Sequence, residues 1–465
     1  MTGLSVEILA AASPAPITSA GNARLGVAVL AGIAVIVLLI TRLRLHAFLA
    51  LTLGSLALGV FAGAPLNKTI TSFTAGLGAT VAGVGVLIAL GAILGRLLAD
   101  SGGADEIVDT ILAKAEGRAM PWAMVLIASV IGLPLFFEVG IVLLIPVVLL
   151  VAKRGNYSLM RIGIPALAGL SVMHGLIPPH PGPLVAIDAL HADLGVTLAL
   201  GVLVAIPTVV IAGPLFSRYA ARWVDVPAPE HLVPQRPPAE LEHRPRFGAT
   251  VFTVLLPVAL MLLKALVDIV VDDPKNGLQR VTDVAGSPLI ALLAAVLVGM
   301  FTLGRAAGFT KERLSTTVEK SLAPIAGILL IVGAGGGFKQ TLIDAGVGQM
   351  ILDLSEHWSI PALLLAWLIA VAIRLATGSA TVATISAAGL VAPLAAGTST
   401  TQTALLVLAV GSGSLFFSHV NDAGFWLVKE YFGMTVGQTV KTWSVMETII
   451  SVVGLGCVLL LSLVL

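Results

Sequence analysis

One carboxylate in the C-terminal half of the chain stands in unusually apolar surroundings. The 47 residues that separate Arg374 from Asp422 contain no Asp, Glu, Lys or Arg. Asp422 lies within the sequence SHVNDAG, together with Ser418, His419 and Asn421. A carboxylate costs about 2.5–3.5 kcal/mol to place in a membrane-spanning segment, so an acid in such a position is seldom without a role. The neighbouring hydroxyl, imidazole and amide groups can hydrogen-bond a polar ligand.

A second isolated acid, Glu138, lies in the apolar sequence LPLFFEVG. A carboxyl group inside an apolar segment can hold a proton near neutral pH, so we expect either Glu138 or Asp422 to carry a proton. The alternative for Glu138 is a structural carboxylate that accepts hydrogen bonds from backbone amides.

Three histidines accompany two interruptions of the apolar pattern. His174 and His180 lie in HGLIPPHPGP, whose four prolines forbid a continuous helix, and His419 lies close to Asp422. The ends of a broken helix offer free peptide groups, and the N-terminal ends favour anions. Imidazoles there can bind an anion or donate a hydrogen bond; the alternative for each is an ordinary buried histidine. A metal site is not expected, because neither an HExxH motif nor a nearby cysteine accompanies His174 and His180.

Hydroxyl side chains gather at residues 377–381, where Ser379 and Thr381 suit a hydroxylated or carboxylate ligand. The alternative is close helix packing through small residues. Arg374 lies just before this sequence and either pairs with an anion or extends to the membrane surface. The glycine-rich residues 333–337 lack the Lys-Ser/Thr of a P-loop, so close helix packing is expected there.

The composition places all these residues in a membrane protein. Hydrophobic residues make up 57% of the 465 residues and charged residues only 11%, and the mean hydropathy is +1.04. A soluble domain is typically about 25% charged, so soluble enzymes, nucleic-acid binders and disordered proteins are excluded. The net charge of +1 is too small for a polyanion-binding surface, and a single cysteine excludes a disulfide framework.

Apolar stretches long enough to cross a bilayer recur along the chain, since about 20 residues suffice for one helix. Ten spans are predicted, at residues 25–41, 47–63, 76–98, 162–187, 194–217, 249–271, 287–303, 322–338, 402–428 and 443–465. Two further stretches, 120–152 and 361–396, carry polar or small residues at their centres and are predicted to be re-entrant hairpins. Because Lys and Arg favour cytoplasmic loops, both termini are predicted to face outside.

The two halves of the chain resemble each other weakly. Gly169 and Gly411 head similar sequences 242 residues apart, and the same offset places Leu133 on Leu375. Five spans in each half make the second copy inverted, an arrangement typical of secondary transporters. The predicted organisation is an extracytoplasmic tail (1–24), a first repeat (25–217, with hairpin 120–152), a cytoplasmic linker (218–248) and an inverted second repeat (249–465, with hairpin 361–396). The fold class is therefore all-α and polytopic, with an inverted repeat, two re-entrant hairpins and two broken helices.

Several sequences resemble the gluconate permease family of gluconate:proton symporters. They are SGGADEI, PLFFEVG, HGLIPPHPGP, GSATVA and the long segment from GSGSLFFSHVNDAG to the C-terminus. The resemblance covers residues 25 to the C-terminus. It implies an elevator-type architecture and proton-driven import of gluconate or a related sugar acid across the inner membrane, although the family also includes carriers for idonate, fructuronate and D-serine.

We therefore expect a symporter for a small hydroxylated monocarboxylate, without a cofactor, a metal or a nucleic-acid partner, and acting as a homodimer in the lipid bilayer. The substrate is expected to be bound by a set of polar side chains at the breaks: His174, His180, Arg374, Ser379, Thr381, Ser418, His419 and Asn421. One alternative is a cation-coupled carrier of D-serine or dicarboxylates on the same scaffold. An alternative from another class is an intramembrane enzyme that uses Glu138 and the histidines.

Overall fold

The structure is a computed structural model that describes residues 16–226, 243–271, 275–347, 350, 360–419 and 422–465. Throughout these residues the chain is helical or in turns and loops, and none of them forms a β-strand. The helices of the first half are α1 (Asn22–Thr41), α2 (Ala47–Ala62), α3 (Leu66–Asp100), α4 (Gly103–Leu112), α5 (Met120–Gly132), α6 (Phe137–Arg154), α7 (Leu159–Leu176), α8 (Pro181–Leu190), α9 (Leu194–Val210) and α10 (Ser217–Trp223).

The second half begins after residues 227–242, which lie in the predicted linker and outside the described residues. Its helices are α11 (Phe247–Val270), α12 (Gly277–Ala285), α13 (Pro288–Gly299), α14 (Lys311–Leu322), α15 (Ala326–Asp344), α17 (Ala362–Thr377), α18 (Ala380–Val391), α19 (Thr400–Ser414), α20 (Ala423–Tyr431), α21 (Val436–Thr439) and α22 (Val445–Val464). Short π-helical turns join α9 to α10 (Ile211–Leu215), follow α13 (Met300–Gly304) and precede α22 (Val440–Ser444).

Eight helical segments among the described residues are long and apolar enough to cross a membrane, and each matches a predicted span. In the two other predicted spans, at 47–63 and 402–428, no single helix is long enough to meet this criterion. Helix α2 has 16 residues, and the span predicted at 402–428 is divided into α19 and α20. The all-helical, polytopic architecture predicted from the sequence is confirmed.

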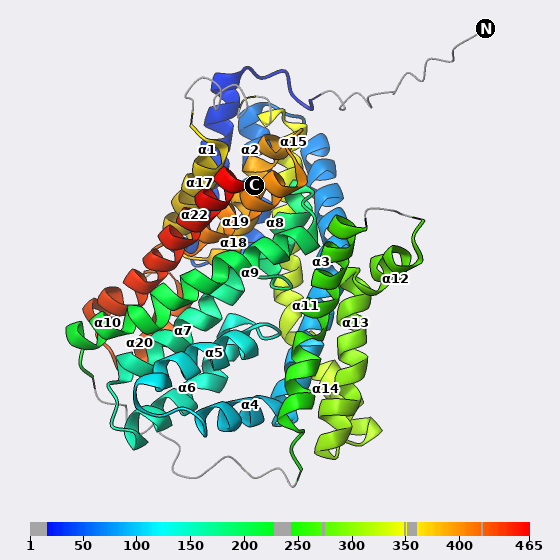
Figure 1. The fold of residues 1–465 in the computed structure, drawn as a ribbon. Helices are drawn as coiled ribbons and strands as arrows, with labels where there is room; N and C mark the ends of the chain where they lie inside the picture. Colours follow the sequence, from blue (N-terminus) through cyan, green and yellow to red (C-terminus); the bar gives the residue numbers. More distant parts are fainter. Residues whose placement is uncertain (1–15, 227–242, 272–274, 348–349, 351–359, 420–421) are drawn as a thin grey trace.

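Helix α3 is longer than predicted, because it begins at Leu66 instead of residue 76 and runs for 35 residues. The polar residues of its first turns suggest a loop. However, the hydroxyls of Thr69, Thr71 and Thr74 bond back to carbonyl oxygens four residues earlier, at 3.0–3.3 Å, within the helix. These bonds satisfy the hydroxyls locally, so the helix continues through a polar sequence. Figure 1 shows α3 running beside α13 along one side of the molecule.

The two predicted hairpins each contain a helix break at the expected place. Helices α5 and α6 are separated by residues 133–136, which include Pro134. Helices α17 and α18 are separated by Gly378, in the left-handed region at φ +71°, and by the extended Ser379. Gly378 ends α17 at little conformational cost because it lacks a Cβ. Ser379 caps α18 by accepting a hydrogen bond from the amide of Val382 at 3.3 Å.

The two predicted broken helices are confirmed as well. Helix α7 ends at Leu176 and α8 starts at Pro181, with an extended His180 as its N-cap. Helix α19 ends at Ser414 and α20 starts at Ala423, and the carboxylate of Asp422 caps α20 by accepting from the amide of Gly424 at 2.8 Å. Among the described residues, the two predicted hairpins and the two predicted broken helices thus supply four interruptions, two in each half of the chain.

The glycine-rich part of α15 packs closely against α3, as predicted. A Cβ on Gly336 would lie 2.0 Å from Thr80 Oγ1, and a Cβ on Gly76 would lie 2.3 Å from the carbonyl oxygen of Gly336. Only glycine permits this approach of two backbones. The α3–α15 pair also contacts α2 and α18, so it joins the N-terminal helices to the second hairpin.

Candidate functional site

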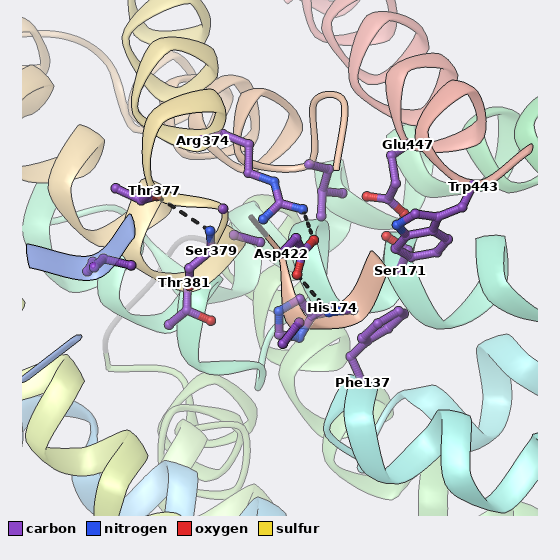
Figure 2. Close-up of a pocket in the computed structure, with 16 residues that line it drawn as sticks. Phe137, Ser171, His174, Arg374, Thr377, Ser379, Thr381, Asp422, Trp443 and Glu447 are labelled. Atoms are coloured by element: carbon purple, nitrogen blue, oxygen red, sulfur yellow. Dashed lines mark hydrogen bonds and ion pairs between the residues drawn. The ribbon is translucent and has the colours of Figure 1, made fainter. Parts of the chain in front are cut away.

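A cavity of about 230 Å³ lies where the broken segments of the two halves meet (Figure 2). Its lining comes from the break between α17 and α18, the N-terminal end of α20, one face of α7, and the start of α22 with the turn before it. The residues that line it are Ile40, Phe137, Ser171, His174, Arg374, Thr377, Gly378, Ser379, Ala380, Thr381, Leu415, Asp422, Ala423, Gly424, Trp443 and Glu447.

An ion pair between Arg374 and Asp422 forms one wall of this cavity. The Arg374 side chain is 3% exposed and that of Asp422 is 14% exposed, so the pair is largely removed from solvent. Figure 2 shows the guanidinium of Arg374, from α17, directed at the carboxylate that caps α20. Charges buried in this way are normally paired, because an isolated buried charge is very costly.

Asp422 accepts hydrogen bonds at both of its oxygens. Oδ2 accepts from Arg374 and from the Ser418 hydroxyl, and Oδ1 accepts from the amide of Gly424. Arg374, in contrast, retains donor capacity, because its buried Nε finds no acceptor among the described residues. A buried donor without an acceptor is unfavourable, so this guanidinium is suited to bind a further anion.

Hydroxyl groups and helix N-termini surround the arginine. Ser379 and Thr381 line the cavity at the start of α18, while the Thr377 hydroxyl bonds to the carbonyl oxygen of Ile373 at 2.9 Å. The first turns of α18 and α20 both border the cavity, and helix N-termini carry partial positive charge that stabilises anions. The site therefore combines a cation, two helix ends and hydroxyls, which suits a hydroxylated carboxylate.

The indole of Trp443 helps to hold the Asp422 carboxylate in place through Ser418. The Nε1–H of Trp443 donates to the Ser418 hydroxyl at 2.7 Å, and that hydroxyl in turn donates to Asp422. Ser444 donates to the carbonyl oxygen of Ser418 as well. The π-helical turn before α22 thus holds Ser418, and through it the carboxylate, in place. The Trp443 ring also packs against Phe137, with ring centroids 5.6 Å apart.

Five of the ten predicted site residues line the cavity: His174, Arg374, Ser379, Thr381 and Asp422. Ser418 lies one layer behind, bonded to Asp422. The structure does not describe Asn421 or the side chain of Glu138.

The other two predicted histidines lie away from the cavity lining. His180 is 3% exposed and its Nε2 bonds to the carbonyl oxygen of Gly132 at 2.7 Å, so it ties α8 to the end of α5. His419 bonds through Nε2 to the carbonyl oxygen of Leu375 at 3.1 Å. Their predicted contacts with substrate stay predictions.

Sequence reasoning missed several lining residues, above all Glu447, Trp443 and Ser171. Glu447 is fully buried in the last helix, at 1% exposure. The signal was present, because Glu447 is an acid within a predicted span, the same argument that drew attention to Glu138. Ser171 and Trp443 carry no comparable signal, since hydroxyls and indoles are common in membrane helices.

No group of three or more His, Cys, Asp or Glu side chains that can hold a metal ion occurs in the described part of the chain. In the cavity, Asp422 accepts from Arg374 and from the Ser418 hydroxyl, and Glu447 accepts from the Ser171 hydroxyl. The polar groups that line the cavity can therefore form hydrogen bonds and pair charges.

The fold resembles that of solved transporter structures. The YdaH transporter of Alcanivorax borkumensis superposes with a TM-score of 0.58 at 18% identity, covering 90% of this chain and 97% of that one. MtrF of Neisseria gonorrhoeae, described in a study of antimetabolite efflux pumps, superposes with a TM-score of 0.63 at 15% identity, covering 84% and 83%. At these identities the likeness concerns the fold alone.

Sequence relatives are far more similar. A gluconate permease of Pseudomonas aeruginosa is 50% identical over 92% of this chain and 96% of its own length. A high-affinity gluconate transporter of Escherichia coli is 45% identical over 92% and 97%, and an L-idonate transporter of the same species is 41% identical over 94% and 98%. The model of the GntP family permeases matches residues 25–464. This chain therefore belongs to the GntP family of permeases, and it is a multi-pass plasma-membrane transport protein and not an enzyme.

Proposed function

We propose that this permease imports gluconate, or a closely related sugar acid, together with protons. The observation that carries the proposal is the buried Arg374–Asp422 pair on the wall of a hydroxyl-lined cavity. Relatives that are 45–50% identical and carry the names of gluconate transporters support the choice of substrate.

The carboxylate of the substrate binds Arg374 in competition with Asp422. A guanidinium has five N–H donors in a planar fork and pairs well with a carboxylate, and the unused Nε of Arg374 adds a donor. The substrate's hydroxyls then bond to Ser379 and Thr381, and Phe137 and Trp443 provide an apolar surface for its carbon chain.

Charge balance explains why a proton accompanies the anion. Bound substrate and Asp422 together place two negative charges beside one guanidinium, an unfavourable arrangement in a poorly solvated site. A proton taken up by a neighbouring carboxyl group offsets the second negative charge. The sequence predicts that either Asp422 or Glu138 carries this proton, and Asp422 lines the cavity.

Alternating access is proposed to follow from the inverted repeat. Four interruptions of the helices lie two in each half of the chain, and the sequences near them resemble each other at an offset of 242 residues, which supports two related halves. In secondary transporters with inverted repeats the substrate site lies where the repeats meet and is exposed to each side in turn. A homodimer in the bilayer remains a prediction, which cross-linking in membranes can test.

Uptake of radiolabelled gluconate into proteoliposomes tests the proposal. An imposed pH gradient, acid outside, is expected to drive accumulation above the equilibrium level, and a sodium gradient alone is not. Unlabelled idonate is expected to compete. Dicarboxylates are expected to compete weakly, because Arg374 is the one guanidinium or ammonium group among the described lining residues. D-serine is expected to compete weakly as well, because it offers a single hydroxyl to Ser379 and Thr381. Accumulation driven only by sodium, or stronger competition by D-serine, contradicts the proposal.

A further inference from the structure

Glu447 is an acid in the cavity to which the transport scheme above gives no task. Its side chain is 1% exposed, and its Oε1 finds no hydrogen-bond partner among the described residues. Ser171 of α7 supplies a side-chain hydrogen bond to the carboxyl group. Figure 2 shows Glu447 and Ser171 next to the Trp443 ring, on the far side of Asp422 from Thr377 and Thr381. An ionised carboxylate with an unpaired buried oxygen is far more costly than a neutral carboxylic acid.

Few charged or titratable side chains surround Glu447. Helices α9 and α19 and the π-helical turn Ile211–Leu215, which all pack against α22, contain no charged or histidine residue. The charged or titratable side chains on the other elements around it are Arg161 and His174 on α7, Arg374 on α17, Lys441 on the turn before α22, and Asp422 at the start of α20. Of these, His174, Arg374 and Asp422 line the cavity with Glu447.

Asp422 and Glu447 differ in what their surroundings stabilise. Asp422 accepts from a guanidinium, a hydroxyl and a backbone amide, and all three donors stabilise an anion. Glu447 has one hydroxyl partner and no cation bonded to it among the described residues. Two carboxyl groups near one arginine therefore sit in unequal environments, the arrangement in which one group holds the proton and the other stays ionised.

We propose that Glu447 is the proton-binding residue of the transport cycle and that Asp422 stays ionised as the internal partner of Arg374. Protonation converts the Glu447 carboxylate to a neutral acid as the substrate's carboxylate adds one negative charge. The net charge of the site is then the same when it is empty and deprotonated as when it holds substrate and a proton. Release of both on the cytoplasmic side restores the starting state.

This inference rests on the proposed function, so the test includes a wild-type measurement that decides proton coupling first. Purified full-length protein in proteoliposomes is assayed for gluconate accumulation under a pH gradient, for gluconate-evoked proton movement with a trapped pH dye, and for gluconate counterflow at equal pH. The variants are Glu447→Gln, which imitates the protonated acid, and Glu447→Asp, which keeps a carboxyl group. The matched control is Glu430→Gln, because the Glu430 side chain is 71% exposed near the end of α20.

Glu447→Gln is expected to reduce accumulation and proton movement by about tenfold or more, as expected when coupling between two ligands is lost. Counterflow, which needs no net proton movement, is expected to fall by no more than about threefold in the same variant. Glu447→Asp is expected to retain part of the proton movement, and Glu430→Gln all of it.

Wild-type proton movement with Glu447→Gln behaving like the wild type overturns the assignment of Glu447 and leaves the proposed function intact. Loss of counterflow in both Glu447 variants also overturns it, because that result indicates a structural acid. Absence of gluconate-evoked proton movement in the wild-type protein overturns the proposed proton coupling itself.

Discussion

At the scale of single residues, the Arg374–Asp422 pair is the feature on which the site depends. The sequence indicates Asp422 by its isolation in an apolar stretch and Arg374 by its position just before the hydroxyl-rich residues 377–381, but it does not indicate that they pair. Whether two residues separated by 47 others meet depends on how α17 and the start of α20 pack, and no local pattern encodes that packing. Glu447 is harder to identify, because an acid near the start of a long apolar stretch also occurs where a membrane helix begins at the membrane surface.

Breaking this pair is expected to cost stability as well as transport. Arg374→Gln leaves Asp422 buried without a cation, and removing one partner of a buried pair typically costs about 3–5 kcal/mol. The variant is expected to unfold at a lower temperature and to lose gluconate uptake. The double variant Arg374→Gln/Asp422→Asn is expected to recover most of the thermal stability, because it restores a neutral hydrogen-bonded pair, but not the uptake.

Thermal unfolding of the purified proteins and uptake into proteoliposomes check both expectations. Arg244→Gln serves as a control, because Arg244 pairs with Asp109 at 2.7 Å on the surface, where Asp109 is 66% exposed. Exposed pairs contribute about 0–1 kcal/mol, so this variant should resemble the wild type. A double variant that is no more stable than Arg374→Gln, or one that transports gluconate, contradicts this account.

At the scale of elements, the sequence predicts helix breaks best where prolines or polar residues interrupt an apolar stretch. Pro134, the prolines at 178, 179, 181 and 183, and the polar residues around 378 and 422 are local signals, so the four helix breaks could be predicted. The start of α3 could not, since threonines favour loops and caps unless their hydroxyls bond back to the helix. The exact ends of most other helices depend on packing in the same way.

The contact between α3 and α15 yields a sharp prediction at this scale. In Gly76→Ala the added Cβ would lie 2.3 Å from the carbonyl oxygen of Gly336, a backbone atom. Overpacking of this kind costs about 1–3 kcal/mol, so the unfolding temperature is expected to fall. Gly78→Ala is the matched control two residues away in α3, because its Cβ meets nothing within 4 Å.

Alanine at position 78 is expected to leave the unfolding temperature unchanged or to raise it, since Ala is favoured over Gly within a helix by about 0.5–1 kcal/mol. Both variants are measured in the same detergent by differential scanning fluorimetry. Equal unfolding temperatures for the two proteins would argue against a backbone contact between α3 and α15.

At the scale of the whole molecule, the orientation in the membrane is a prediction from the distribution of Lys and Arg. Helix α13 and the turns after it connect α12 to α14, so the two amphipathic helices should lie on opposite sides of the bilayer. Single cysteines at the exposed positions 280 and 312, in a Cys457→Ser background, test this with a membrane-impermeant maleimide.

Arg280→Cys is expected to react in intact cells, and Glu312→Cys only after the cells are permeabilised. The Cys457→Ser protein without an added cysteine is the control for background labelling. Reaction of both cysteines in intact cells, or of neither, is incompatible with the predicted topology and with an inverted second repeat.

The carboxylate that caps α20 has one more consequence for a carrier that works among abundant inorganic ions. Because Asp422 is held by the fold, it faces Arg374 at a far higher effective concentration than any dissolved ion. Chloride or phosphate must displace a tethered competitor and has no hydroxyl chain with which to engage Ser379 and Thr381. We therefore expect gluconate binding by the empty carrier to change little when chloride replaces phosphate. The Asp422 carboxylate already serves as the counter-ion of Arg374 when no substrate is bound.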